Sequence, residues 1–114
     1  MKMQYNAGLS GEAAAEQYLC ARGMRVLARR YRGQDGEIDL IMQDGEYIVF
    51  VEVKARPAAQ KGQGLLAITP AKQARMKHAA QSYLVQQNEL ERPVRFDALE
   101  ITRDGILHIP NAFW

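Results

Sequence analysis

The spacing of apolar residues along the chain predicts two helices and five strands. Apolar positions recur at helical spacing from about Ser10 to Arg22, and again in a segment that begins at Thr69 and Pro70 and fades near Gln86. Runs rich in β-branched and aromatic residues predict strands over residues 25–31, 37–43, 47–54, 94–101 and 106–113. This αβββαββ order predicts an α/β fold in which helices flank a mixed central sheet.

Turn and cap residues support these boundaries. Gly23 suits the end of the first helix, and Thr69 followed by Pro70 suits the start of the second. Asp44-Gly45 lies between two apolar runs and predicts a tight hairpin turn. Residues 32–36 predict a loop between strands, and residues 55–68, rich in Gly, Gln and Ala, predict a long loop of a kind that often carries function.

The predicted hairpin gathers charged residues on one face of the sheet. A two-residue turn at Asp44-Gly45 places Gln43 opposite Glu46, and therefore Asp39 opposite Phe50. Because every second residue of a strand lies on the same face, one face then carries a set of four charged side chains, whereas valines fill the other. The four are Glu37, Asp39, Glu52 and Lys54. A three-residue loop would break this register.

Carboxylates crowded on an apolar sheet repel one another, and a hard divalent cation removes that cost. We therefore expect Asp39 and Glu52 to bind Mg²⁺, or Mn²⁺, with the backbone carbonyl of Val53 completing the protein ligands. Such an ion makes water a nucleophile near neutral pH, and Lys54 is placed to face the attacked phosphate. This set of groups suits the hydrolysis of a phosphodiester.

A structural reading of the same residues stays open. Glu52 and Lys54 are two apart on a strand and could form a surface ion pair, while Asp39 could cap a turn. The apolar run from Tyr47 to Val51 argues against this reading, because an exposed edge strand does not need apolar residues on both faces. Charges near the end of a central, buried strand are typical of an active site.

Composition bounds the setting of the protein. The 114 residues favour one domain, spanning residues 1–114. The single cysteine, Cys20, excludes an internal disulfide and is expected to be a small packing residue of the first helix, in a reducing cytoplasm. The start of the chain lacks the apolar stretch of a signal peptide, and no apolar run is long enough to span a bilayer, so no membrane partner is expected.

Net charge says less about partners than the distribution of charge does. The formal net charge is only +2, but basic residues gather in two short segments, 29–32 and 72–78. Taken alone, such runs are more often a solvated surface, yet they are also compatible with contact to a nucleic acid backbone. The candidate phosphate contacts are Arg32, Arg56, Lys72 and Arg75. Lys72 is notable because a cation in the first turn of a helix is unfavourable unless it meets an anion.

The paired motifs "GEIDLI" and "FVEVKAR" resemble those of the YraN family of small bacterial proteins. The resemblance extends over nearly the whole chain, from "GEAAAEQYL" to "RFDALEI" and beyond. That family in turn resembles the restriction-endonuclease-like fold of the PD-(D/E)XK nucleases, and the archaeal Holliday-junction resolvases most closely. The resemblance implies a nuclease-like αβββαβ core with a mixed central sheet.

The resemblance also implies roles for individual residues. Asp39 matches the aspartate of the nuclease motif, Glu52 and Lys54 match its E-x-K, and Glu12 matches an acidic residue often present on the first helix. Glu37 has no firm counterpart, so its role stays open. The chain departs from the family at residues 30–32, where "RYR" lacks an expected asparagine.

Two functions of different class follow from this pattern. The first is a Mg²⁺-dependent endonuclease that cuts DNA, in particular branched DNA, and the resolvase likeness suggests a homodimer. The alternative is a nucleic-acid-binding module without catalysis on a nuclease-like scaffold. A protein-interaction subunit is a third, weaker reading.

Overall fold

The order of helices and strands is the one that the sequence predicts. The computed structural model describes residues 11–56 and 68–113. The elements are α1 (Gly11–Ala21), β1 (Arg25–Gly33), β2 (Gly36–Asp44), β3 (Tyr47–Arg56), α2 (Pro70–Gln86), β4 (Val94–Thr102) and β5 (Gly105–Phe113). The predicted α/β fold, with an αβββαβ core and a further strand, is therefore confirmed.

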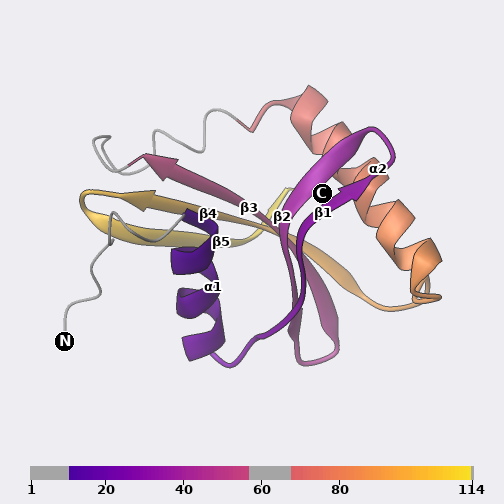
Figure 1. Ribbon diagram of the computed structural model, residues 1–114, viewed down its shortest axis with the longest axis horizontal. Helices are drawn as coiled ribbons and strands as arrows, with labels where there is room; N and C mark the ends of the chain where they lie inside the picture. The colour runs from indigo at the N-terminus through magenta and orange to yellow at the C-terminus, as the bar shows by residue number, and fades with distance from the viewer. Residues whose placement is uncertain (1–10, 57–67, 114) are drawn as a thin grey trace.

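The strands form one mixed sheet in the order β1-β2-β3-β4-β5 (Figure 1). Strands β3 and β4 are parallel and are connected through α2, whereas the other neighbouring pairs are antiparallel. Strand β3 thus lies at the centre of the sheet, and its residues Ile48 to Val53 are all buried. This position confirms the expectation that the apolar run from Tyr47 onward forms a central strand.

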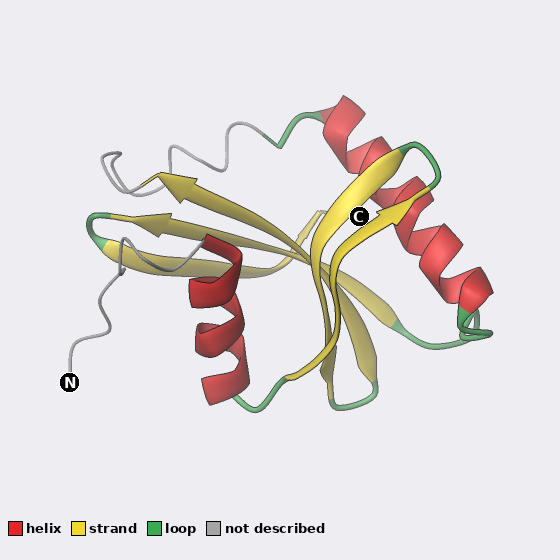
Figure 2. Cartoon of the chain, viewed as in Figure 1, coloured by secondary structure: helices red, strands yellow, loops and turns green. Residues whose placement is uncertain are grey.

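The two helices lie on opposite faces of the sheet and create two apolar cores (Figure 2). Valines 49, 51 and 53 of β3 face α1, where they pack with Ala15 and Leu19. Ile48 and Phe50 face α2, where they pack with Met76 and Tyr83. Strict alternation along β3 then places the next even-numbered residues, Glu52 and Lys54, on the α2 face. In the described part of the chain, no helix is long and apolar enough to span a membrane.

The register of the β2–β3 hairpin differs from the prediction by one residue on each strand. Ile41, not Asp39, lies opposite Phe50, and Asp44 pairs with Tyr47, so the turn residues are Gly45 and Glu46. Gly45 has a φ of +60°, whereas Glu46 is not among the residues with positive φ. A positive φ at the first turn position alone marks a type II′ turn, which requires glycine there. Because both strands shift together, odd residues of β2 still oppose even residues of β3.

The predicted loop over residues 32–36 is shorter than expected. Strands β1 and β2 continue to Gly33 and Gly36, which pair, leaving only Gln34 and Asp35 in the turn. The tip of this hairpin packs closely against α2: a Cβ added at Gly36 would lie 2.6 Å from the backbone oxygen of Arg75. Glycine is therefore needed there for close approach, and the hairpin extends because α2 supports its end.

Two further expectations, for Cys20 and for the loop over residues 55–68, differ from the structure. Cys20 is exposed, so the interpretation of this residue as a packing residue was wrong. It lies beside Leu19, which is fully buried, on the outward side of the same helical turn. The predicted loop over residues 55–68 begins later than expected, because Ala55 and Arg56 belong to β3, and residues 57–67 lie outside the described part of the chain.

Candidate metal centre

Asp39 lies where the regular pairing of β2 and β3 ends. The last paired residues are Leu40 and Val51, and beyond them the Oδ2 atom of Asp39 accepts the backbone N–H of Val53 at 2.8 Å. Ile38 belongs to the core on the α2 face, whereas Leu40 belongs to the core on the α1 face. The alternation of β2 is thus interrupted at Asp39, and this irregularity lets its carboxylate reach across to β3.

Glu52 is a buried carboxylate with two ammonium groups beside it. Its side chain is only 2% exposed, on the face of the sheet that α2 covers. Its Oε2 atom lies 2.5 Å from Nζ of Lys72 and 3.3 Å from Nζ of Lys54. Two cations on one oxygen compensate the desolvation of a charge that would otherwise be very costly to bury.

The first turn of α2 positions Lys72. Thr69 is the N-cap, as the sequence predicts, and its hydroxyl accepts the backbone N–H of Lys72 at 3.2 Å. Pro70 occupies the first turn, where its missing N–H causes no loss. Burial lowers the pKa of Lys72, but the close contact with Glu52 and the charge of this carboxylate outweigh burial and raise the pKa. The structure thus brings Lys72, predicted as a surface phosphate contact, into the carboxylate cluster.

The first turn of α1 approaches the same end of β3. A Cβ added at Gly11 would lie 2.5 Å from Cβ of Ala55, so only glycine allows this contact. Glu12 follows directly and forms an ion pair with Arg30, whose Nη2 lies 3.0 Å from its Oε1. Arg30 has a φ of 49° and falls between the residues of β1 that pair with Leu40 and Ile38, opposite Asp39. The irregularities of β1 and β2 therefore coincide.

Burial and the neighbouring carboxylates shift the pKa of Asp39. Burial raises its pKa to about 7, and the charges of Glu52 and, more weakly, Glu12 act in the same direction. The N–H of Val53 opposes the shift by stabilising the carboxylate. Asp39, Glu52 and Glu12 are thus close enough to influence one another, although Glu12 also has Arg30 as a partner.

The donor set fits a small, hard divalent cation. Mg²⁺ is commonly held by one or two carboxylates and retains several waters, so Asp39 and Glu52 suffice as its charged ligands. In an extended strand the N–H and C=O of one residue point to the same side. The carbonyl of Val53 therefore faces the side from which its N–H meets Asp39. Within residues 11–56 and 68–113, no three His, Cys, Asp or Glu side chains are placed to hold one metal ion together, so the charged protein ligands here are two carboxylates.

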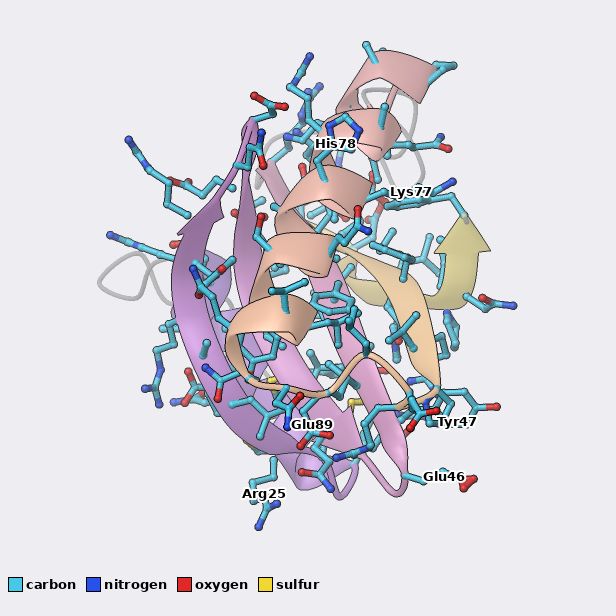
Figure 3. All side chains as sticks on the ribbon, turned by 90° about the vertical axis from the view of Figure 1, so that its right-hand side faces the viewer. Arg25, Glu46, Tyr47, Lys77, His78 and Glu89 are labelled. Atoms are coloured by element: carbon cyan, nitrogen blue, oxygen red, sulfur yellow. The ribbon has the colours of Figure 1, made fainter. Side chains whose placement is uncertain are left out.

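The remaining residues of the predicted patch lie further out. Glu37 is partly exposed and forms an ion pair with Arg32 at 3.2 Å, so the structure does not bring it to Asp39. Arg32 itself is 83% exposed, and Arg56 and Arg75 are exposed as well. Arg56 is the last residue of β3, and Arg75 lies one helical turn after Lys72 on α2. Figure 3 shows Lys77 and His78, which follow Arg75 and Met76, on the helix in front of the sheet.

A second buried carboxylate, which sequence reasoning did not single out, is Asp97 of β4. It accepts hydrogen bonds from Nε and Nη2 of Arg95 and from the backbone N–H of Asn111, at 2.9, 3.0 and 2.9 Å, and Nε2 of His108 lies 2.8 Å from its Oδ2. These contacts lie at the irregularity of the β4–β5 ladder between Phe96 and Ala98. Burial alone would raise the pKa of Asp97, but the hydrogen bonds outweigh it and lower the pKa. With both oxygens engaged, Asp97 serves to fasten β5 to β4.

The sequence pattern alone did not predict the contacts that Arg30, Lys72 and Asp97 make. Only the unfavourable place of Lys72 in the first turn of α2 pointed to an anionic partner. Arg30 and Asp97 lie at strand irregularities, which carry no strong sequence signal.

Comparison with known proteins agrees with the family that the motifs suggested. The family described as "Uncharacterised protein family UPF0102" matches residues 11–101. A UPF0102 protein of Geobacter metallireducens is 43% identical over 110 residues, covering 93% of this chain and 90% of that protein. A UPF0102 protein of Symbiobacterium thermophilum is 44% identical over 116 residues, covering 97% and 98%. UPF0102 is the family of the YraN proteins, and the chain belongs to it.

Proposed function

We propose that this protein is a Mg²⁺-dependent endonuclease that hydrolyses phosphodiester bonds in DNA. The observation that carries the proposal is the meeting of Asp39 and Glu52 at the end of the central strand, with Lys54 and Lys72 beside them. Buried carboxylates that repel one another are a poor choice for stability alone. Their presence with nearby lysines is the arrangement that a metal-dependent phosphodiesterase needs.

Each residue has a role in this proposal. Asp39 and Glu52 hold the ion together with the carbonyl of Val53, and the N–H of Val53 fixes the orientation of the Asp39 carboxylate. Bound Mg²⁺ would activate a water molecule for in-line attack on phosphorus and stabilise the charge that develops there. Lys54, only partly exposed, would donate to a phosphate oxygen and stabilise the same charge. Glu12 is close enough to orient a water ligand once Arg30 has moved aside.

A polyanionic substrate is favoured by the cations around the site. Arg56 at the end of β3 and Arg75 on α2 are exposed, and Arg32 is exposed on the hairpin of β1 and β2. Such side chains would contact successive phosphates of a nucleic acid and make its binding sensitive to salt. DNA as the substrate, branched DNA in particular, a homodimer and a cytoplasmic setting all belong to this proposal.

The test is cleavage of a panel of linear and branched DNA substrates in Mg²⁺ or Mn²⁺. Asp39→Asn keeps an acceptor for the N–H of Val53 but removes a charged metal ligand, and Glu52→Gln does the same on β3. We expect each to abolish cleavage while its circular dichroism spectrum stays that of the wild type. Glu37→Gln is the matched control, because this exposed carboxylate pairs with Arg32 outside the cluster. Cleavage at the wild-type rate by both site variants would refute the proposal.

One observation favours the second candidate function, a nucleic-acid-binding module without catalysis. The carboxylate of Glu52 already has two ammonium groups beside it, so its burial is compensated without a metal. A module of this kind would bind DNA equally well with EDTA or Mg²⁺, and Asp39→Asn would leave binding unchanged or tighter. Salt-insensitive binding, or none, would exclude it.

A further inference from the structure

The contact between Lys72 and Glu52 differs in kind from the contact between Lys54 and Glu52. Lys54 is on the same strand as Glu52, two residues away, so the strand itself keeps the two residues next to each other. Lys72 comes from another element, α2, and its Nζ lies 2.5 Å from Oε2 of Glu52. Mg²⁺ binds carboxylate oxygens at about 2.1 Å, so an ammonium and the ion cannot occupy the same side of this oxygen together.

The position of Lys72 in the first turn of α2 makes its contact with Glu52 favourable only while Glu52 has no other cation. The first turn of a helix carries partial positive charge and unsatisfied N–H groups, so a lysine there is unfavourable unless it has an anionic partner. Glu52 is that partner in the free protein, and its Oε2 atom is buried and meets no described group with hydrogen-bond geometry. The side chain of Lys72 is 31% exposed, so it has room to turn toward solvent if Glu52 takes another cation.

The exchange of Lys72 for a metal ion at Glu52 changes the charge of the site and favours the binding of a phosphate. Asp39 and Glu52 carry two negative charges when ionised, and the two lysines beside Glu52 carry two positive charges. Glu100 of β4, which is fully buried and lies opposite Lys54, adds a third carboxylate to this face of the sheet. A divalent ion that binds these carboxylates adds two positive charges and takes over the compensation of Glu52, so an ammonium group beside Glu52 is no longer needed there. The displaced ammonium would then stand at the N-terminus of α2, where a phosphate is favoured.

We propose that Lys72 is an internal counter-ion of the free site: a divalent cation displaces it from Glu52, and its freed ammonium then binds a phosphate of the substrate. This inference rests on the proposed function and assigns an order of binding to it. Metal binds first, and only the loaded site accepts the polyanion. Lys72 therefore has two positions, one on Glu52 without metal and one on phosphate with it.

The experiment is calorimetric titration of Mn²⁺ alone into the full-length protein and four variants. Lys72→Met removes the competing charge, and we expect it to bind Mn²⁺ about tenfold more tightly than the wild type. Lys72→Arg keeps a cation and should stay close to the wild type. Lys77→Met makes the same change on the same helix away from the carboxylates and should have no effect. Glu52→Gln should lose the binding.

A second experiment measures the affinity of the protein for DNA with and without Ca²⁺. Ca²⁺ binds the same oxygen ligands as Mg²⁺ does, and the readout is complex formation, not cleavage. We expect Ca²⁺ to tighten DNA binding by the wild type at least about tenfold, and Lys72→Met to lose most of this gain despite its tighter metal binding. If Lys72 had only a structural role, its replacement would not raise the affinity for metal and lower the affinity for DNA at the same time.

The outcomes distinguish this inference from the proposed function. If the wild type and Lys72→Met bind Mn²⁺ equally and Glu52→Gln does not, the counter-ion role is refuted while the metal centre stands. If the wild type binds Mn²⁺ weakly or not at all and Lys72→Met binds it, the inference is supported. If no protein in the set binds Mn²⁺, both the inference and the metal centre of the proposed function are refuted.

Discussion

The carboxylate of Asp39 accepts the backbone N–H of Val53 at 2.8 Å, at the point where β2 and β3 stop pairing. A side chain thus takes the place that a backbone carbonyl would hold in a longer ladder. Asp39 is fixed in this way from one side, while Glu52 approaches from the other and both charges are partly removed from water. This arrangement stores repulsion between two carboxylates in the folded protein.

Asp39→Asn should stabilise the metal-free protein. Asparagine keeps an oxygen that accepts the N–H of Val53, but it removes the charge that repels Glu52. We expect the free energy of unfolding to rise by about 1 kcal/mol, a gain typical of relieving strain at a functional site. Urea denaturation in EDTA measures this change. Glu37→Gln, at an exposed ion pair, should stay within about 0.5 kcal/mol of the wild type. A loss of stability in Asp39→Asn would show that repulsion is not dominant there.

Gly36→Ala should destabilise the protein through a clash with α2. The added Cβ would lie 2.6 Å from the backbone oxygen of Arg75, so either the hairpin or the helix must move. We expect a loss of about 1–3 kcal/mol in thermal or urea unfolding. Gln81→Ala changes an exposed position of the same helix and provides the control. Wild-type stability in Gly36→Ala would mean that the contact between the hairpin and α2 is not close in solution.

Thr69→Ala should weaken the start of α2. The hydroxyl of Thr69 accepts the N–H of Lys72, and the loss of an N-cap destabilises a protein by about 1 kcal/mol. Thr69→Ser keeps the hydroxyl and should restore most of the stability. Hydrogen exchange of the Lys72 amide offers a local measurement, with faster exchange expected in Thr69→Ala alone. Equal exchange in the two variants would contradict the cap.

Asp97 should make the protein sensitive to acid. Its pKa is lowered in the folded state, so its contribution to stability is complete above the unfolded pKa of about 3.9 and is lost as the pH falls through the folded value. We therefore expect the wild type to lose stability below about pH 4 more steeply than Asp97→Asn does.

At neutral pH, Asp97→Asn should cost about 3 kcal/mol, because Arg95 loses its buried partner. Asp104→Asn, at an exposed turn of the same sheet, is the control for a general effect of charge. Parallel stability curves against pH for the wild type and Asp97→Asn would refute the role of this carboxylate.

The sequence by itself determined the order of the elements, because apolar spacing, N-caps and β-branched runs are local properties. It also indicated that Asp39, Glu52 and Lys54 belong to one constellation. A shift of both strands by one residue leaves odd-numbered residues of β2 opposite even-numbered residues of β3, as predicted. The family followed from the same motifs. These features depend on local spacing or on the pairing of two strands that one tight turn connects.

Tertiary structure decided how the constellation is built. The turn at Gly45 set the register, and an interruption of β2 turned Asp39 toward Val53. The packing of α2 on the sheet brought Lys72 onto Glu52, which is twenty positions earlier in the sequence, and the close contact at Gly11 brought Glu12 near. Such contacts depend on how whole elements pack against each other, and no local spacing encodes the distance between a helix terminus and a strand end.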